Sequence, residues 1–158
     1  MPITSTIAGV ICTDLKVMSD HRGWLVELFR TDQIESGRQP AMAYLSMTHP
    51  GVTRGPHEHR NQTDHFAFIG PSTFRLHLWD NRVNSPTYRA YESFDVGQYR
   101  PMAFEVPCGV VHAYQNIGQV DGLVHNFPDH LYRGAKRSDE VDEIRHEDDP
   151  HSPFIIKD

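Results

Sequence analysis

The stretch GVTRGPHEHRNQTDHFAFIG, residues 51–70, decides the fold of this 158-residue chain. His57 and His59 stand two positions apart within it, so on an extended strand both imidazoles leave the same face and can meet one ligand. A second stretch, PCGVVHAYQN, follows at residues 107–116. Together the two stretches predict two hairpins that direct imidazoles toward one point.

In the second stretch, His112 and Asn116 share a face of the predicted strand, and Gly109 supplies a permissive turn before it. The two stretches resemble the paired motifs of the cupin superfamily, in which H-x-H is followed by an acid and P-x-G-x-x-H-x-x-x-N comes later. Asp64 stands in the acidic position. The resemblance implies an all-β fold, a cupin-type double-stranded β-helix or jelly-roll barrel with few short helices.

Short apolar runs between clusters of Gly, Pro and Asn support an antiparallel barrel or sandwich. Strands are expected at residues 7–18, 22–29, 41–49, 88–94, 102–106, 110–117 and 123–127. We further expect residues 63–69 and 74–80 to form a hairpin around Gly70, and residues 31–37 to form a short helical turn.

The charge, the apolar runs and the cysteines of the chain restrict the class of protein to which it can belong. The formal net charge of −6 and the pI near 6.0 argue against a general affinity for nucleic acid, because phosphates demand a basic surface. Pro, charge or His interrupts every apolar run long before about 20 residues, so no membrane span is expected. Two distant cysteines, Cys12 and Cys108, and a start unlike a signal peptide predict a reduced, cytoplasmic protein.

The length predicts one domain of ordinary size with its own core. We expect residues 1–135 to form the barrel. Residues 136–158, KRSDEVDEIRHEDDPHSPFIIKD, are mostly charged, and we expect them to pack on or near the barrel mouth.

Four side chains are candidates for a metal site: His57, His59, Asp64 and His112. Neutral imidazoles with one carboxylate suit a divalent first-row transition metal, and the sequence does not separate Fe, Mn, Ni and Zn. Alternatively, the same imidazoles carry out acid–base chemistry without a metal, since an ordinary His pKa of about 6.5 suits proton transfer near neutrality. Both alternatives stay open at this point.

A second resemblance spans most of the chain. The segments DHRGWLVELF, TRGPH, DNRVNSPT, VPCGVVHAY and IRHEDDP are similar, in that order, to motifs of the dTDP-4-dehydrorhamnose 3,5-epimerase family. The resemblance implies a homodimer, with no cofactor required, that removes a proton next to the keto group of a nucleotide-linked sugar. His57 then matches the base, and Asp149 matches the acid that orients it. Arg22, Glu27 and Arg54 match contacts to the nucleotide diphosphate, the first two from the neighbouring subunit.

The chain departs from this family at two catalytic positions. The family has a Lys after R-G-L-H that steadies the enolate, and here protonated His59, His65 or a bound metal is the expected substitute. Where the family has a Tyr-Lys pair, this chain has His125 and Asn126, so His125 or Tyr114 is expected to act on the other sugar face. These departures favour one-centre epimerisation or ketoisomerisation over double epimerisation.

Further positions complete the expected site. One residue is inserted near Asp149 relative to the family motif, which leaves Asp148 as an alternative, and His112, Asn116 and Tyr132 are expected to contact substrate. RGPHEH also resembles the R-G-x-H-A-H of sugar-nucleotide 3,4-ketoisomerases. We therefore expect an epimerase or ketoisomerase of a nucleotide sugar of the dTDP-4-keto-6-deoxyhexose type. The alternatives are a metal-dependent cupin isomerase or oxygenase and a non-catalytic sugar-binding cupin.

Overall fold

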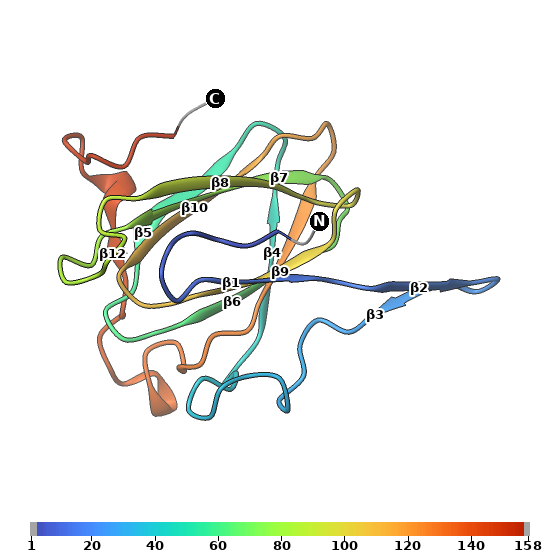
Figure 1. The fold of residues 1–158 in the computed structure, drawn as a ribbon, viewed down its shortest axis with the longest axis horizontal. Coiled ribbons are helices and arrows are strands. Elements are labelled where there is room, and N and C mark those ends of the chain that lie inside the picture. The colour runs from blue at the N-terminus through green and yellow to red at the C-terminus, as the bar shows by residue number, and fades with distance from the viewer. Residues whose placement is uncertain (1–2, 157–158) are drawn as a thin grey trace.

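Two five-stranded antiparallel sheets face each other in the computed structural model, which describes residues 3–156 (Figure 1). One sheet has the strand order β1-β9-β6-β11-β4 and the other β12-β5-β10-β7-β8. The expected all-β jelly-roll fold of cupin type is confirmed. The strands are β1 (Ile11–Asp14), β2 (Val17–Asp20), β3 (Gly23–Val26), β4 (Tyr44–Thr48), β5 (Thr53–Glu58), β6 (Asp64–Phe68), β7 (Thr73–Asp80), β8 (Tyr91–Gly97), β9 (Met102–Val106), β10 (Val110–Asn116), β11 (Gly122–Asn126) and β12 (Ile144–Arg145).

The hydrophobic core lies between the two sheets and follows the two-residue period of the strands. β6 contributes Phe66 and Phe68, and β7 contributes Phe74, Leu76 and Leu78. Burying a side chain of this kind stabilises the fold by about 1.5–3 kcal/mol relative to leaving it exposed. The other buried members of the cluster are Ile7, Val10, Val96, Met102, Phe104, Val106, Val110, Tyr114 and Val124.

The hairpin predicted from residues 63–69 and 74–80 is wrong. β6 pairs with β9 and β11, whereas β7 pairs with β8 and β10, so the turn at Gly70 carries the chain from one sheet to the other. Phe68 and Phe74 then meet across the core, with ring centroids 5.8 Å apart. Both strands have alternating apolar residues because they face the same core from opposite sides, and a hairpin would show the same period.

The predicted helical turn at residues 31–37 is also wrong. Two separate turns occupy this stretch, and each is closed by one backbone hydrogen bond between residues three apart. The N–H of Gln33 donates to the carbonyl of Arg30, and the N–H of Arg38 donates to the carbonyl of Glu35. The bonds do not continue from one residue to the next, so no helix propagates. The helices within residues 3–156 are two 3₁₀ turns, η1 (Ala135–Arg137) and η2 (His146–Asp148), and neither is long and apolar enough to cross a membrane.

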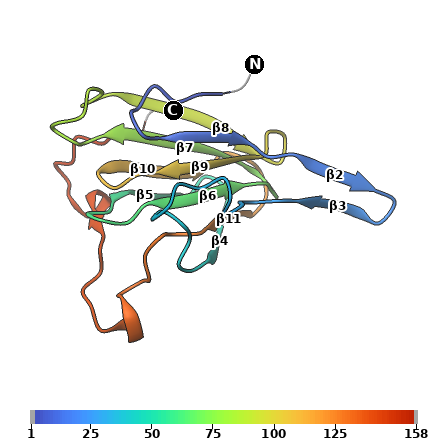
Figure 2. The ribbon, with the colours of Figure 1, turned by 60° about the horizontal axis from the view of Figure 1, so that its bottom comes forward.

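β2 and β3 form a two-stranded arm that extends away from the sandwich (Figures 1 and 2). The single strand expected at residues 7–18 is therefore divided: β1 belongs to the first sheet, and after Leu15 and Lys16 the chain leaves that sheet to form β2. The arm exposes large apolar side chains, with Trp24 60% and Leu25 59% accessible.

The DNRVNSPT segment forms a structural network around the buried carboxylate of Asp80. That carboxylate accepts hydrogen bonds from the Arg82 guanidinium and from the hydroxyls of Ser85 and Thr87. Although burial opposes ionisation, these bonds hold the pKa of Asp80 well below its ordinary value. The network fixes the long connection between β7 and β8, and the Arg82 guanidinium also donates to the carbonyl of Ala8.

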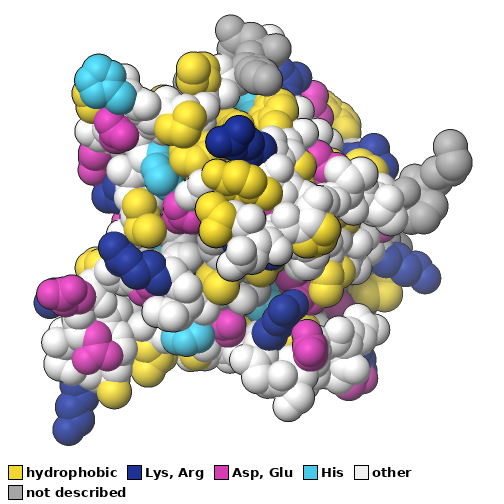
Figure 3. Space-filling view, turned by 60° about the vertical axis from the view of Figure 1, so that its left-hand side comes forward, with side chains coloured by type: hydrophobic (Ala, Val, Ile, Leu, Met, Phe, Trp, Pro, Cys, Tyr) yellow, Lys and Arg dark blue, Asp and Glu magenta, His cyan; other side chains and the backbone are white. Residues whose placement is uncertain are grey.

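The C-terminal segment returns along the edge of the second sheet, where β12 pairs with β5. Beyond β12, the His146 ring lies 2.8 Å from the Glu58 carboxylate, and Phe154 packs edge-on against Trp79 at the outer face of the sheet. Figure 3 views this end of the molecule and shows acidic, basic and His side chains interspersed, without a field of one sign. Residues 1–2 of the predicted barrel unit (1–135) and residues 157–158 of the predicted C-terminal unit (136–158) lie outside the described part of the chain.

Candidate active site

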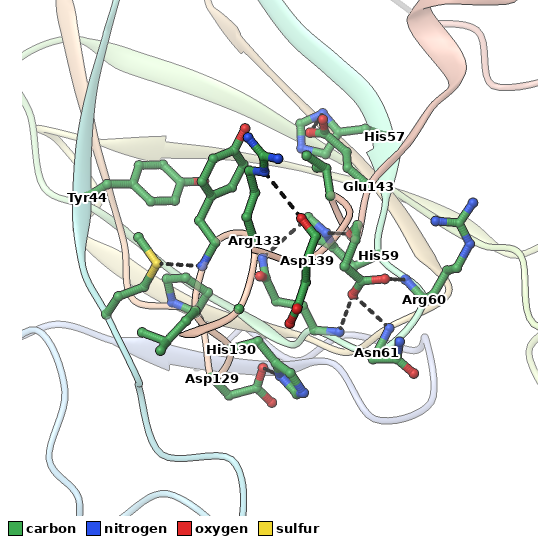
Figure 4. Close-up of a pocket in the computed structure, with 18 of the residues that line it drawn as sticks. Tyr44, His57, His59, Arg60, Asn61, Asp129, His130, Arg133, Asp139 and Glu143 are labelled. Atoms are coloured by element: carbon green, nitrogen blue, oxygen red, sulfur yellow. Dashed lines mark hydrogen bonds and ion pairs between the residues drawn. The ribbon is translucent and has the colours of Figure 1, made fainter. Parts of the chain in front are cut away.

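A cavity of about 1400 Å³ opens beside β5, and the C-terminal segment forms one of its walls. The structure brings three imidazoles together: His57 on β5, His59 directly after the end of β5, and His112 on β10. The centroid of the His57 ring lies 4.5 Å from that of His112 and 6.0 Å from that of His59. Figure 4 shows His57 and His59 in this cavity, with Tyr44 and Arg133 from other elements.

A bulge in β5 sets which side chains face the cavity. The pairing of β5 with β10 runs from His112↔His57 to Tyr114↔Arg54, so two residues of β5, Gly55 and Pro56, stand opposite Ala113. Gly55 has φ 87°, and a Cβ there would lie 2.6 Å from the His112 carbonyl oxygen, so no other residue fits without a shift of the backbone. The bulge lets Arg54 and His57 both line the cavity.

Asp64 is buried at the centre of the imidazole cluster. Its Oδ2 lies 3.1 Å from Nε2 of His59 and 3.2 Å from Nε2 of His112. Burial opposes its ionisation, but the contacts with His112 and His59 hold its pKa well below the ordinary value. Burial likewise lowers the pKa of His59, but the hydrogen bond and charge of Asp64 outweigh it and raise that pKa to about 9. An imidazolium–carboxylate pair therefore fits this position.

One buried nitrogen of His112, Nε2, faces Asp64 without an aligned hydrogen bond. Its Nδ1 lies 3.1 Å from the carbonyl oxygen of Val110, which suits an N–H donor there and a lone pair on Nε2. That Nε2 is buried, points at Asp64 and makes no aligned hydrogen bond. Burial also lowers the pKa of His112, so a proton on both nitrogens is disfavoured. A lone pair facing a carboxylate oxygen is the arrangement that a metal cation between them would satisfy.

The carboxylates nearest the His57 ring come from the C-terminal segment. Oε1 of Glu143 and Oε1 of Glu147 each lie 3.8 Å from Nδ1 of His57. Burial opposes ionisation of Glu147, but its contact with His57 lowers its pKa below the ordinary value. The structure places Asp149 elsewhere: it is exposed, and its carboxylate accepts a hydrogen bond from the backbone N–H of His151. Asp148 pairs with Arg145.

Two of the expected site residues face away from the cavity. Side chains alternate along β6 and β11, so Asp64 and Asn126 point inward and hydrogen-bond to each other. Their neighbours therefore point outward: the His65 ring reaches the Arg38 carbonyl, and His125 stacks on Phe127 with the two rings 9° from parallel. Because both rings lie on the faces of their strands that point away from the cavity, the expectation that His65 and His125 act in the site is wrong.

The remaining expected residues divide into three groups. Arg54, Tyr114 and Tyr132 line the cavity, and the hydroxyl of Tyr114 lies 3.0 Å from that of Ser46. Asn116 is buried, and its amide donates to two backbone carbonyls, so its place is structural. Arg22 and Glu27 belong to the arm and its root and do not line the cavity of their own chain.

Tyr44 on β4 is a cavity residue that the sequence did not reveal. Its hydroxyl oxygen accepts a hydrogen bond of 2.8 Å from the Asn126 amide, which leaves the hydroxyl proton free to be donated. Burial raises the pKa of Tyr44 above its ordinary value, so the hydroxyl stays protonated at neutral pH. The parity that it shares with Ser46 on β4 was the available signal, but no motif marks it.

Comparison with known proteins decides the family. The model of the dTDP-4-dehydrorhamnose 3,5-epimerase family matches residues 4–148. The chain belongs to this family. It is 37% identical over 127 residues to a probable low-salt glycan biosynthesis epimerase of Haloferax volcanii, covering 80% of this chain and 81% of that protein. It is 31% identical over 141 residues to a spore coat polysaccharide biosynthesis protein of Bacillus subtilis, covering 88% of each.

A solved structure supports the fold of this family member. A dTDP sugar isomerase from Desulfovibrio desulfuricans superposes with a TM-score of 0.81 at 22% identity, covering 94% of this chain and 91% of that one. The predicted relationship to the epimerase family and to the cupin fold is confirmed.

Proposed function

We propose that the protein epimerises a nucleotide-linked 4-keto sugar by removing and returning a proton at a carbon next to the ketone. Membership of the epimerase family supports this class of reaction. The observation that carries the assignment of the base is the environment of His57, whose Nδ1 faces Glu143 and Glu147 while Nε2 makes no hydrogen bond to a described residue. An imidazole oriented by a carboxylate on one side can take a proton on the other.

A carbon acid ionises only if charge on the enolate oxygen is stabilised as it develops. We assign this role to the imidazole cluster, where Asp64 raises the pKa of His59 to about 9, because the strand that carries Lys in the family offers Asp64 and His65 here. For return of the proton to the opposite sugar face, Tyr44 is our candidate, since its free hydroxyl proton lies in the same cavity. We propose one-centre epimerisation as the outcome, and a glycan or polysaccharide precursor as the product.

The test is incubation of the protein with dTDP-4-keto-6-deoxyglucose in heavy water, followed by NMR of the recovered sugar. We expect deuterium at one carbon next to the ketone, with inversion there. Deuterium at both carbons would indicate double epimerisation, and migration of the ketone would indicate a ketoisomerase. Tight binding without any exchange would contradict catalysis and favour a sugar-binding module.

We also propose that His59, His112 and Asp64 can hold a divalent transition metal. The orphaned Nε2 of His112 supports this site, and three protein ligands are the usual number for a catalytic metal. A metal bound there would supply a Lewis acid for the ketone oxygen. His57 is then left as the base, although the sequence had grouped it with the ligands.

Elemental analysis of protein purified without chelator checks this site. We expect a near-stoichiometric transition metal that is lost in His112→Ala and retained in His57→Asn. Loss of metal from His57→Asn would make His57 a ligand and contradict its assignment as the base. A metal-free wild-type protein would leave the protonated His59 as the cationic group.

We propose a homodimer in which the arm packs on a second copy of the chain. A two-stranded hairpin alone is marginally stable in water, and this one exposes Val17, Met18, Trp24 and Leu25. Arg22 lies at the tip of the arm, where its guanidinium pairs with Asp20 while 78% of its side chain stays accessible to a neighbouring chain. The proposal follows the family resemblance in assigning Arg22 and Glu27 to the partner's site.

Sedimentation of Trp24→Ser/Leu25→Ser checks the arm. We expect wild-type protein at about twice 18.1 kDa and the double variant at the monomer mass. Tyr99→Ser is the matched control, because Tyr99 is an even more exposed aromatic residue outside the arm. A wild-type monomer, or a double variant that remains dimeric, would count against the proposal.

A further inference from the structure

Asp142 connects the C-terminal segment to the turn that follows β5. Its carboxylate accepts hydrogen bonds from three consecutive backbone N–H groups: 3.0 Å from Arg60, 2.9 Å from Asn61 and 2.9 Å from Gln62. A single side chain thus satisfies three of the backbone donors of the turn, and the fourth, the N–H of Thr63, donates to Asp129. Because the turn joins His59 to Asp64, its conformation sets where these two residues meet.

The backbone of Asp142 acts on the same imidazole cluster. Its carbonyl oxygen forms a short hydrogen bond with Nδ1 of His59. A carbonyl can only accept, so this contact places a proton on Nδ1 and directs Nε2 of the ring to Asp64. The Gln62 amide, held by the same turn, donates to the other oxygen of Asp64 at 2.8 Å.

We propose that Asp142 is a positioning residue that holds His59 and Asp64 in the geometry required for the reaction. The carboxylate fixes the turn, and the carbonyl fixes the ring of His59. Asp142 lies two residues before β12, which anchors this part of the chain on β5. The kinetic part of this inference rests on the proposed function, whereas the geometric part does not.

The variants Asp142→Ala and Asp142→Asn test the proposal. Ala removes both acceptor oxygens, whereas Asn keeps one for the turn, so the rate should fall in the order wild type, Asn, Ala. We expect kcat of Asp142→Ala to fall by about 10–100-fold with KM changed less than about threefold, because small misplacements of catalytic groups act on the rate. Asp121→Asn is the matched control, since exposed Asp121 also pairs with a His, His49, outside the cavity.

Proton NMR of the His59 ring supplies a measurement that does not depend on turnover. The spectra are recorded with Zn²⁺, which is diamagnetic, and the Nδ1–H signal is assigned by its loss in His59→Gln. We expect the signal to be weakened but still present in Asp142→Asn and to be lost by exchange with water in Asp142→Ala. If Asp142→Ala does not fold, the graded loss of kcat and weakening of this signal in Asp142→Asn carry the same test.

The outcomes separate this inference from the proposed function. An unchanged His59 signal in Asp142→Ala, with only thermal stability lowered, would reduce Asp142 to a cap of the turn and overturn the proposal. A different result would be loss of the His59 signal in Asp142→Ala while the wild-type protein incorporates no deuterium into the sugar. That result would contradict the proposed reaction and still support the positioning of His59 by Asp142.

Discussion

Replacing His57 by Asn is expected to reduce the rate of deuterium incorporation into the 4-keto sugar by about 10³-fold, within the range that general base catalysis contributes. Asn cannot accept the proton from carbon, although its amide occupies a similar volume. The ring lines the cavity and is not a member of the hydrophobic core, so the protein should remain folded. Binding of dTDP should change little, because the substitution removes a group that acts on the sugar.

The measurement is the initial rate of exchange by NMR, with dTDP affinity by calorimetry on the same samples. His125→Asn is the control, since that ring is stacked on Phe127 outside the cavity. A His57→Asn protein that exchanges at the wild-type rate would exclude His57 as the base. Equal losses in both variants would indicate that the fold, and not the base, had been damaged.

Glu147→Gln is expected to lower kcat by about 10²-fold with a smaller change in KM. The lowered pKa of Glu147 keeps its carboxylate ionised at neutral pH, where it favours the imidazolium that forms when His57 accepts a proton. Gln retains the size of the side chain but not the charge. Glu143, at the same 3.8 Å from Nδ1, can compensate in part, so we expect Glu143→Gln/Glu147→Gln to lose more than either single variant.

Asp149→Asn provides the decisive comparison, because the family resemblance assigns the orienting role to Asp149. Its exposed position predicts less than a twofold effect on kcat. A larger loss in Asp149→Asn than in Glu147→Gln would restore the assignment made from the resemblance and exclude Glu147 as the partner of His57.

The sequence was sufficient for the parts of the molecule that depend on strand period and on motif spacing. The H-x-H pair and the later P-x-G-x-x-H predicted three imidazoles that converge, because parity on a strand fixes the face of each side chain. The same rule, applied to the sequence His125-Asn126-Phe127, would have placed the side chains of His125 and Asn126 on opposite faces of the strand. Matching His125 to a Tyr of the family by alignment overrode that parity and led to an incorrect expectation.

Other features had no signal in a single sequence. The partner of His57 could not be found because Glu143 and Glu147 lie in a charged segment with many carboxylates, and only the pairing of Ile144 and Arg145 with β5 selects two of them. The crossing between sheets at Gly70 was hidden for a related reason. Strands on opposite sides of one core carry the same alternation as two strands of a hairpin.

The bulge at Gly55 and Pro56 has a consequence for transplanting this site into another β-barrel. In a regular strand, residues three apart point to opposite sides, yet Arg54 and His57 share the cavity because the bulge adds one position. A graft that copies only the side chains onto an unbulged strand would turn one of the two toward solvent. The recipient must also accept the close approach of Gly55 to the His112 carbonyl, so the portable unit is a pair of strands with their local backbone irregularity.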